Sequence, residues 1–125
     1  MKYIGGCHKM KKLPDEIIML NKIIPAEIIL FDYRIDSPGV YVIADLNNNI
    51  LYVGEAKNIY KRLQRKDHPI NKKIPGFKFE NHSIFCLIYH DDQKRWRAET
   101  FLIAATNPIY NDIKYLYGCT KKRKR

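Results

Sequence analysis

The chain has 125 residues, of which 23 are Lys or Arg and 13 are Asp or Glu, so its formal net charge is +10. That length suffices for one domain with a single core, and every apolar run is too interrupted to cross a membrane. The positive charge favours a polyanionic partner, with nucleic acid as the first candidate and an anionic membrane surface as the second.

Cysteine usage and the first residues indicate a compartment. Cys7, Cys86 and Cys119 are odd in number and widely spaced, which excludes a disulfide framework and a CxxC metal site. The start MKYIGGCHKMKK lacks the apolar stretch of a signal peptide. We therefore expect a reducing, cytoplasmic location.

Residues 1–35 are expected to form an extension that contains one short helix. The stretch PDEIIMLNKII, residues 14–24, is amphipathic, and Pro14 suits a first turn. Its buried face would consist of Ile17, Leu20 and Ile24. The next stretch, EIILFDY, is typical of either a strand or a buried turn, and the pattern leaves both open.

Residues 39–54 predict a β-hairpin, because two β-branched and aromatic runs flank Asn47-Asn48-Asn49. A two-residue turn would pair residue 46 with 49 and residue 43 with 52. Valines and leucines would then share one face, while Tyr41 and Tyr52 would lie diagonally on the other. A three-residue turn would send the tyrosines to opposite faces, so we expect the two-residue turn. Gly39 and Gly54 would leave the tyrosine face open to an approaching group.

The rest of the chain predicts a helix, a loop, a strand and a second helix. The first helix covers residues 58–65 with Asn58 as its cap, and residues 66–79 are mostly loop because two prolines break them. SIFCLIYH, residues 83–90, is a buried strand. Residues 92–106 form the second helix, with Asp91 or Asp92 as the cap. The order indicates an α+β fold with three central strands.

Glu99 falls beside the apolar stripe of the helix over residues 92–106. Trp96, Leu102 and Ile103 are its neighbours on the helix surface. A buried carboxylate needs a cationic partner, which is either a metal ion or an arginine. Arg95, four residues earlier, offers a surface ion pair worth only about 0.3–0.5 kcal/mol.

Five positions together resemble the GIY-YIG endonuclease superfamily over about residues 37–112. GVY at 39–41 and YVG at 52–54 resemble its two signature triplets, and YVGEAKNIYKRL resembles the N-terminal nuclease module of the bacterial excision-repair endonuclease. Tyr52 follows Tyr41 by eleven residues, and Arg62 follows Tyr52 by ten. Glu99 lies on the later helix, and Asn111 follows it by twelve residues.

The resemblance implies a three-stranded antiparallel sheet flanked by helices. It places a nuclease domain at 36–113. Outside the resemblance, we expect residues 1–35 to form an N-terminal extension that packs on the core and residues 114–125 to form a basic tail. It also implies a divalent-metal-dependent DNA endonuclease that hydrolyses phosphodiester bonds. Mg²⁺ or Mn²⁺, as one ion, is the implied cofactor.

The resemblance assigns catalytic roles residue by residue. Tyr41 would be the general base, Tyr52 would hydrogen-bond the phosphate or the water, and Arg62 would stabilise the phosphate. Glu99 would be the metal ligand.

The chain departs from the family pattern at two places. Glu55 stands where some members have a lysine, and Lys57 would substitute for that cation. Lys66 stands where many members have a histidine or tyrosine, and either His68 or Tyr60 would serve instead.

Lysines and arginines near this motif would contact DNA phosphates. The expected DNA-binding residues are Lys57, Lys61, Arg65, Lys72, Lys73 and Asn111, although Asn111 also suits a tie between the last helix and the sheet. Specificity would come from DNA structure, from self-association or from a partner protein that targets the nuclease, and the oligomeric state stays open. The alternatives are a catalytically inactive nucleic-acid-binding module and an accessory protein with the same fold.

Overall fold

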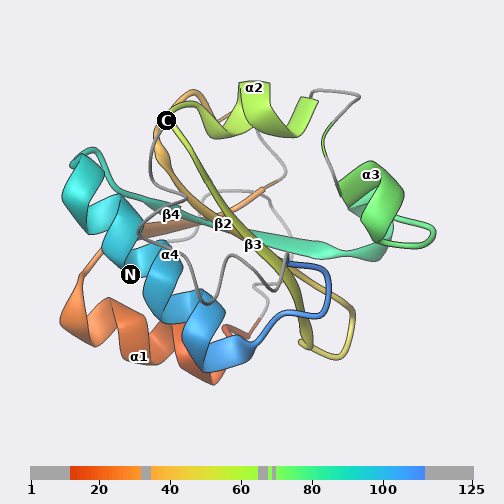
Figure 1. Ribbon diagram of the computed structural model, residues 1–125, viewed down its shortest axis with the longest axis horizontal. Helices are drawn as coiled ribbons and strands as arrows, with labels where there is room; N and C mark the ends of the chain where they lie inside the picture. Colours follow the sequence, from red (N-terminus) through yellow and green to blue (C-terminus); the bar gives the residue numbers. More distant parts are fainter. Residues whose placement is uncertain (1–11, 32–34, 65–67, 69, 112–125) are drawn as a thin grey trace.

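The computed structural model describes residues 12–31, 35–64, 68 and 70–111 (Figure 1). A four-stranded antiparallel sheet crosses the centre in the order β1-β4-β2-β3. Its strands are β1 (Glu27–Leu30), β2 (Gly39–Ala44), β3 (Ile50–Ala56) and β4 (Ser83–Ile88). The helices are α1 (Asp15–Ile23), α2 (Ile59–Gln64), α3 (Ile70–Lys73) and α4 (Asp92–Thr106), with a 3-10 turn η1 (Phe79–Asn81). The α+β class is therefore confirmed.

The sheet has one strand more than the three predicted. β1 pairs with β4 from Glu27 opposite Ile88 to Leu30 opposite Phe85. Without β1, that edge of β4 would present unpaired backbone N–H and C=O groups. The segment that the sequence left open between strand and turn is thus a strand over its first four residues.

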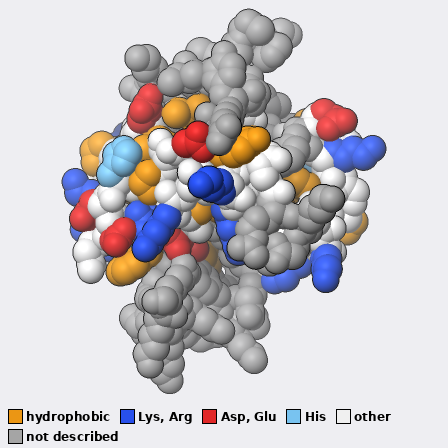
Figure 2. Space-filling model, turned by 90° about the horizontal axis from the view of Figure 1, so that it is seen from above, with side chains coloured by type: hydrophobic (Ala, Val, Ile, Leu, Met, Phe, Trp, Pro, Cys, Tyr) orange, Lys and Arg blue, Asp and Glu red, His pale blue; other side chains and the backbone are white. Residues whose placement is uncertain are grey.

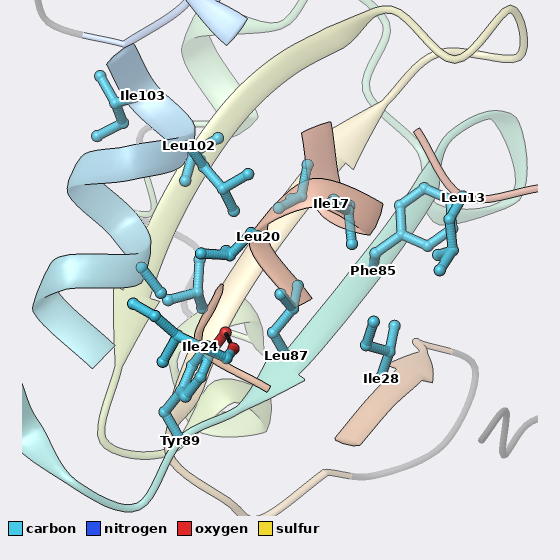
Figure 3. Packing of buried hydrophobic residues seen from close by; sticks show 14 of the residues in the cluster. Leu13, Ile17, Leu20, Ile24, Ile28, Phe85, Leu87, Tyr89, Leu102 and Ile103 are labelled. Carbon is cyan, nitrogen blue, oxygen red and sulfur yellow. Dashed lines mark hydrogen bonds between the residues drawn. The ribbon is translucent and has the colours of Figure 1, made fainter. Parts of the chain in front are cut away.

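The N-terminal helix and β1 belong to the same core as the hairpin. Ile17 and Leu20 of α1 are fully buried, and they pack with apolar residues of β2, β4 and α4 (Figure 3). The hydroxyl of Tyr89, just after β4, donates a 2.6 Å hydrogen bond to the carbonyl of Ile24. The predicted buried face of the first helix is therefore present.

Two hydrophobic clusters cover the two faces of the sheet. α1 and α4 lie on one face and α2 lies on the other (Figure 1). The first cluster includes Val40, Val42 and Val53 with Leu102 of α4, and the second includes Tyr41 and Ile43 with residues of α2 and α3. Alternation along β2 thus sends its valines and its tyrosine to opposite sides.

The hairpin turn differs from the predicted two-residue turn. The N–H of Asp45 donates to the carbonyl of Asn49, and the N–H of Asn48 donates to the carbonyl of Asp45, each at 3.0 Å. Asn48 has a φ of 66°, so an asparagine takes the left-handed position that this turn requires. The loop therefore spans residues 46–48, and residue 46 does not pair with 49.

A β-bulge corrects the consequence of the longer turn. The register shifts between Ile43 and Ala44, so that Ile43 still pairs with Tyr52 while Ala44 pairs with Ile50. The tyrosines consequently share a face, as predicted, but Leu51 joins their side instead of the valine side. Leu46 is 67% exposed, so its predicted place among the valines is wrong as well.

The ends of α2 and α4 follow their local signals closely. The Asn58 side chain accepts from the N–H of Lys61 and caps α2, and the Asp91 side chain accepts from the N–H of Lys94 and caps α4. α4 ends at Asn107, which adopts a φ of 47°.

The predicted loop over 66–79 is not all loop, because it contains α3 and the start of η1. Burial of Ile70 and Ile74, which lie between the two prolines, accounts for α3.

In the described part of the chain, no helix combines the length and the apolar character that a membrane span requires.

Candidate active site

Tyr41 lies across a glycine on the neighbouring strand. It pairs with Gly54 of β3, and a Cβ atom added to Gly54 would lie 2.4 Å from both Cζ and the hydroxyl oxygen of Tyr41. The absence of a side chain at Gly54 therefore lets the phenol extend over β3, an edge strand of the sheet.

The two glycines do not leave this face open, which corrects the sequence expectation. A Cβ atom on Gly39 would lie 2.2 Å from the carbonyl oxygen of Leu87 and 3.0 Å from Cδ1 of Ile59. At both glycines the free space is filled by the chain's own atoms, so the glycines allow close internal packing.

Tyr41, Tyr52 and His68 form a compact group of rings. The ring centroids of the two tyrosines are 6.2 Å apart and the rings are stacked, while the imidazole lies 5.7 Å from one and 5.8 Å from the other. Nε2 of His68 lies 2.6 Å from the hydroxyl oxygen of Tyr41. His68 is thus the predicted substitute that contacts Tyr41.

A backbone hydrogen bond defines the tautomer of His68. The N–H of Ile70 donates to Nδ1 of His68 at 3.1 Å. Because Nδ1 uses its lone pair as an acceptor, the neutral imidazole carries its proton on Nε2. Nε2 then donates to Tyr41, and the phenol oxygen is the acceptor. A donor in this position stabilises the phenolate form of Tyr41.

Arg62 and Glu99 act electrostatically on the same phenol from different helices. Burial is the main factor that raises the pKa of Tyr41 above its ordinary value, and the charges of Tyr52 and Glu99 raise it further. The charge of Arg62 and a hydrogen bond from its guanidinium lower the pKa of Tyr41. Charges from α2 and α4, which lie on opposite faces of the sheet, therefore both act on the Tyr41 phenol.

Glu99 offers a carboxylate, the type of ligand that a hard divalent cation prefers. Glu99 is only 4% exposed, and the described residues contain no group of three or more His, Cys, Asp or Glu that could hold a metal ion. A structural zinc site would need such a group. Mg²⁺ and Mn²⁺ need fewer protein ligands than structural zinc does. One carboxylate suffices for them when waters and substrate phosphate complete the coordination shell.

Arg95 does not make the exposed ion pair that the sequence offered. It is 1% exposed, and its Nε donates to the carboxylate of Glu55 at 2.8 Å. Its other contacts are Nη2 to Asp92 at 2.5 Å and Nη1 to the carbonyl of Tyr89 at 3.4 Å. One feature of the sequence pointed to this pair: Glu55 stands where some family members have a lysine.

Asn111 is tied to the outer edge of β3. Its Oδ1 accepts from the N–H of Val53 at 2.9 Å, and its Nδ2 donates to the carbonyl of Val53 at 2.8 Å. The N–H of Tyr110 donates to the carbonyl of Leu51 at 3.0 Å. Together these groups pair with the edge strand as a further strand would, which supports the tie between the last helix and the sheet.

The expected DNA-contacting lysines in the described part of the chain are exposed, and they lie on two helices and just after a strand. Lys57 follows β3, Lys61 lies on α2, and Lys72 and Lys73 lie on α3. On the face that carries α2, Lys and Arg side chains occupy several places and are interspersed with acidic ones (Figure 2). Arg65 and the basic residues 121–125 lie outside the described residues.

Several curated proteins similar to this chain carry the same name. UvrABC system protein C of Chlamydia abortus (strain DSM 27085 / S26/3) is 32% identical over 78 residues, which cover 60% of this chain and 13% of that protein. The protein of the same name from Actinobacillus pleuropneumoniae serotype 5b (strain L20) is 34% identical over 76 residues, with coverages of 59% and 12%. The chain thus aligns with about one eighth of the length of these relatives.

A solved structure and a family model agree with this similarity. The structure is the GIY-YIG N-terminal endonuclease domain of UvrC from Thermotoga maritima, a point mutant bound to its catalytic divalent cation. It matches with a TM-score of 0.50 and 21% identity, covering 74% of this chain and 92% of that chain, which shows a shared fold. The model of the GIY-YIG catalytic domain matches residues 37–114, more than half of the sequence. The chain therefore belongs to the GIY-YIG family of endonucleases.

Proposed function

We propose that this protein is a divalent-metal-dependent DNA endonuclease that hydrolyses phosphodiester bonds. The observation that carries the proposal is the convergence on Tyr41 of a second phenol, an imidazole N–H, a guanidinium and a carboxylate. Phosphodiester hydrolysis needs a base for water, donors for the phosphate and a way to offset negative charge. The residues around Tyr41 offer each of these.

Tyr41 is the proposed general base. A free tyrosine has a pKa of about 10, and burial raises the pKa of Tyr41 further. Its phenolate therefore needs donors, which Arg62 and Nε2 of His68 provide. His68 cannot accept the proton of Tyr41 at Nε2, because that nitrogen already carries one. Its role is to hold the phenol oxygen as an acceptor directed at the water.

Arg62 and Tyr52 are the proposed phosphate contacts. The guanidinium of Arg62 presents a planar fork of donors that matches phosphate oxygens. Tyr52 is half-buried beside Tyr41 and offers a hydroxyl to the phosphate or to the water.

Glu99 is the proposed ligand of one Mg²⁺ or Mn²⁺ ion. Such an ion, when bound, offsets phosphate charge and stabilises the departing 3′ oxygen. The Thermotoga maritima domain is described as bound to its catalytic divalent cation, which supports a divalent ion here.

The exposed lysines and the name of the curated relatives support inferences about the substrate and the partners of this protein. The exposed lysines after β3 and on α2 and α3 would contact phosphates without reading sequence. The curated relatives are named as one component of the UvrABC system. We infer that a partner protein or a distinctive DNA structure directs this nuclease to its target.

Incubation with supercoiled plasmid tests the activity. With Mg²⁺ or Mn²⁺ we expect nicked or linear product, and we expect EDTA and Glu99→Gln each to abolish it. Glu27→Gln is the matched control, because Glu27 is an exposed carboxylate on β1, at the far edge of the sheet. Cleavage mapping on duplex, bubble, flap and four-way junction DNA would then identify the preferred structure.

The same assay separates the alternatives. An inactive nucleic-acid-binding module would retard the plasmid equally with and without metal, and an accessory protein would neither cut nor retard it. Cleavage that Glu99→Gln leaves intact would overturn the assignment of the metal ligand.

A further inference from the structure

A buried ion pair joins the strand of the YVG triplet to the helix that carries Glu99. Glu55 directly follows Gly54 on β3, and Arg95 lies in the first half of α4. The two side chains are 6% and 1% exposed, and Nε of Arg95 lies 2.8 Å from Oε1 of Glu55. We name this pair the Glu55–Arg95 clamp.

The clamp also connects with the strand of the GVY triplet. Nη1 of Arg95 donates to the carbonyl of Tyr89, and the N–H of Tyr89 donates to the carbonyl of Pro38, the residue before Gly39. Arg95 therefore links α4 to residues that border both signature triplets.

Glu99 lies between this clamp and a second tie at the other end of α4. Residues four apart on a helix are surface neighbours, so Glu99 is one turn beyond Arg95 on the same side. Beyond the end of α4, Tyr110 and Asn111 hydrogen-bond to Leu51 and Val53 of β3. Fixing α4 to β3 at both ends sets the rotation of the helix and hence the direction of the Glu99 side chain.

Arg95 has no surface with which to contact DNA. It is 1% exposed, and each of its three side-chain nitrogens has a hydrogen-bond acceptor in Glu55, Tyr89 or Asp92. Some family members have a lysine at the position of Glu55. Because Arg95 is buried, it cannot take over a contact of that lysine with the substrate. Its effect on the reaction must pass through the groups that it holds in place.

We propose that Glu55 and Arg95 are positioning residues that fix the rotation of α4 and hence the direction of the Glu99 carboxylate, which would hold the metal ion. Supporting residues behind a metal ligand commonly contribute about 10–100-fold to metal affinity or activity. The inference rests on the proposed endonuclease function and concerns residues that this function leaves without a role.

Four variants separate positioning from simple stabilisation. Arg95→Met and Glu55→Gln each leave one partner unpaired, whereas the double variant removes both charges and avoids an orphaned buried ion. Arg95→Lys keeps a cation beside Glu55 but loses the planar fork. Lys94→Met is the control, because Lys94 is an exposed neighbour on α4.

Three measurements apply to each variant: thermal unfolding, Mn²⁺ affinity of the free chain by electron paramagnetic resonance, and kcat and KM for plasmid cleavage. We expect the double variant to unfold near the wild-type temperature yet to lose about 10–100-fold in Mn²⁺ affinity and kcat, with KM unchanged. Arg95→Lys should lose less Mn²⁺ affinity and kcat than Arg95→Met, and Lys94→Met should match the wild type.

A double variant that binds Mn²⁺ and cuts like the wild type would overturn the inference, because the pair would then serve stability alone. If Arg95→Met fails to fold, the double variant and Glu55→Gln still decide the question. A wild-type chain that never cuts DNA would refute the proposed function instead. Weakened Mn²⁺ binding in the double variant would then still support the positioning role.

Discussion

At the scale of single residues, Gly54 and Tyr41 depend on each other. The phenol occupies the space in which a Cβ atom of residue 54 would lie, so the YVG triplet supplies room for the tyrosine of the GVY triplet, the proposed general base. The two triplets therefore form one steric unit, although their tyrosines are eleven positions apart.

Replacing Gly54 with alanine should displace the Tyr41 ring. Overpacking of this kind costs about 1–3 kcal/mol of unfolding free energy, and misplacing the base should lower kcat on the order of 100-fold. Denaturant unfolding and plasmid cleavage measure the two effects. Gly76→Asn is the control, because Gly76 has a φ of +65° and open space around it, and asparagine tolerates that conformation. Equal losses in both variants would contradict the steric argument.

The raised pKa of Tyr41 predicts how cleavage depends on pH. Because burial keeps Tyr41 protonated at neutral pH, the active phenolate fraction should grow with pH, and kcat should rise about tenfold per pH unit. His68→Phe removes the Nε2 donor and should shift the rise to higher pH, while His68→Gln, which keeps an N–H donor, should shift it less. Rates that do not change between pH 6.5 and pH 9 in the wild type would exclude Tyr41 as the base.

Raised tyrosine pKa values also determine how stability changes at high pH. Burial raises the pKa of Tyr89 to about 12 and also raises the pKa of Tyr41. Both phenols stay protonated in the folded chain while the unfolded chain ionises near pH 10, so their contribution is complete below that pH and is lost as the pH rises above it. Rates above about pH 10 therefore need a parallel unfolding measurement.

At the scale of elements, α4 and the edge of β3 form one unit. The turn after α4 pairs with β3 through Tyr110 and Asn111, and the carboxamide of Asn111 uses both polar atoms on Val53. This arrangement covers the outer edge of the sheet next to the tyrosines.

Asn111→Ala should separate the two roles that the sequence allowed. Losing both hydrogen bonds to Val53 should cost about 1–3 kcal/mol of unfolding free energy. If Asn111 is a tie, kcat should fall while DNA affinity stays unchanged, as measured by fluorescence anisotropy in EDTA. Thr106→Ala is the control for losing a hydrogen bond near the end of α4. Weaker DNA binding at unchanged stability would indicate a direct DNA contact instead.

Local patterns predicted most elements, but they failed where two effects combine. The caps at Asn58 and Asp91 followed from residues adjacent to their helices. The hairpin prediction gave the correct tyrosine face for the wrong reason, since a three-residue loop and a bulge compensate each other. Alternation alone cannot reveal a bulge, because one extra residue restores the pattern beyond it.

At the scale of the whole molecule, the charge of +10 is the property most directly linked to the proposed DNA substrate. Lys57, Lys61, Lys72 and Lys73 are exposed after β3 and on α2 and α3, whereas α1 and α4 pack on the other face of the sheet from α2. Electrostatic binding through such lysines releases counterions from DNA and is therefore sensitive to salt.

Replacing Lys57, Lys61, Lys72 and Lys73 together with glutamine should weaken binding to every DNA sequence alike. If each lysine neutralises one phosphate, the slope of log K against log salt concentration should fall by about 3–4. A salt titration by anisotropy measures this slope. The control replaces Lys22 and Lys94, exposed lysines on α1 and α4, and should leave it unchanged. An unchanged slope in the fourfold variant would locate the DNA contacts elsewhere.

The sequence by itself determined the family, the α+β class, the helix caps and the candidate residues, because spacing, periodicity and capping are properties of neighbouring positions. Only the tertiary structure decided that β1 completes a fourth strand, that His68 donates to Tyr41 and that Arg95 is buried against Glu55. Each of these contacts joins residues at least 27 positions apart. Such pairings depend on how the elements pack around the sheet, which no local pattern specifies.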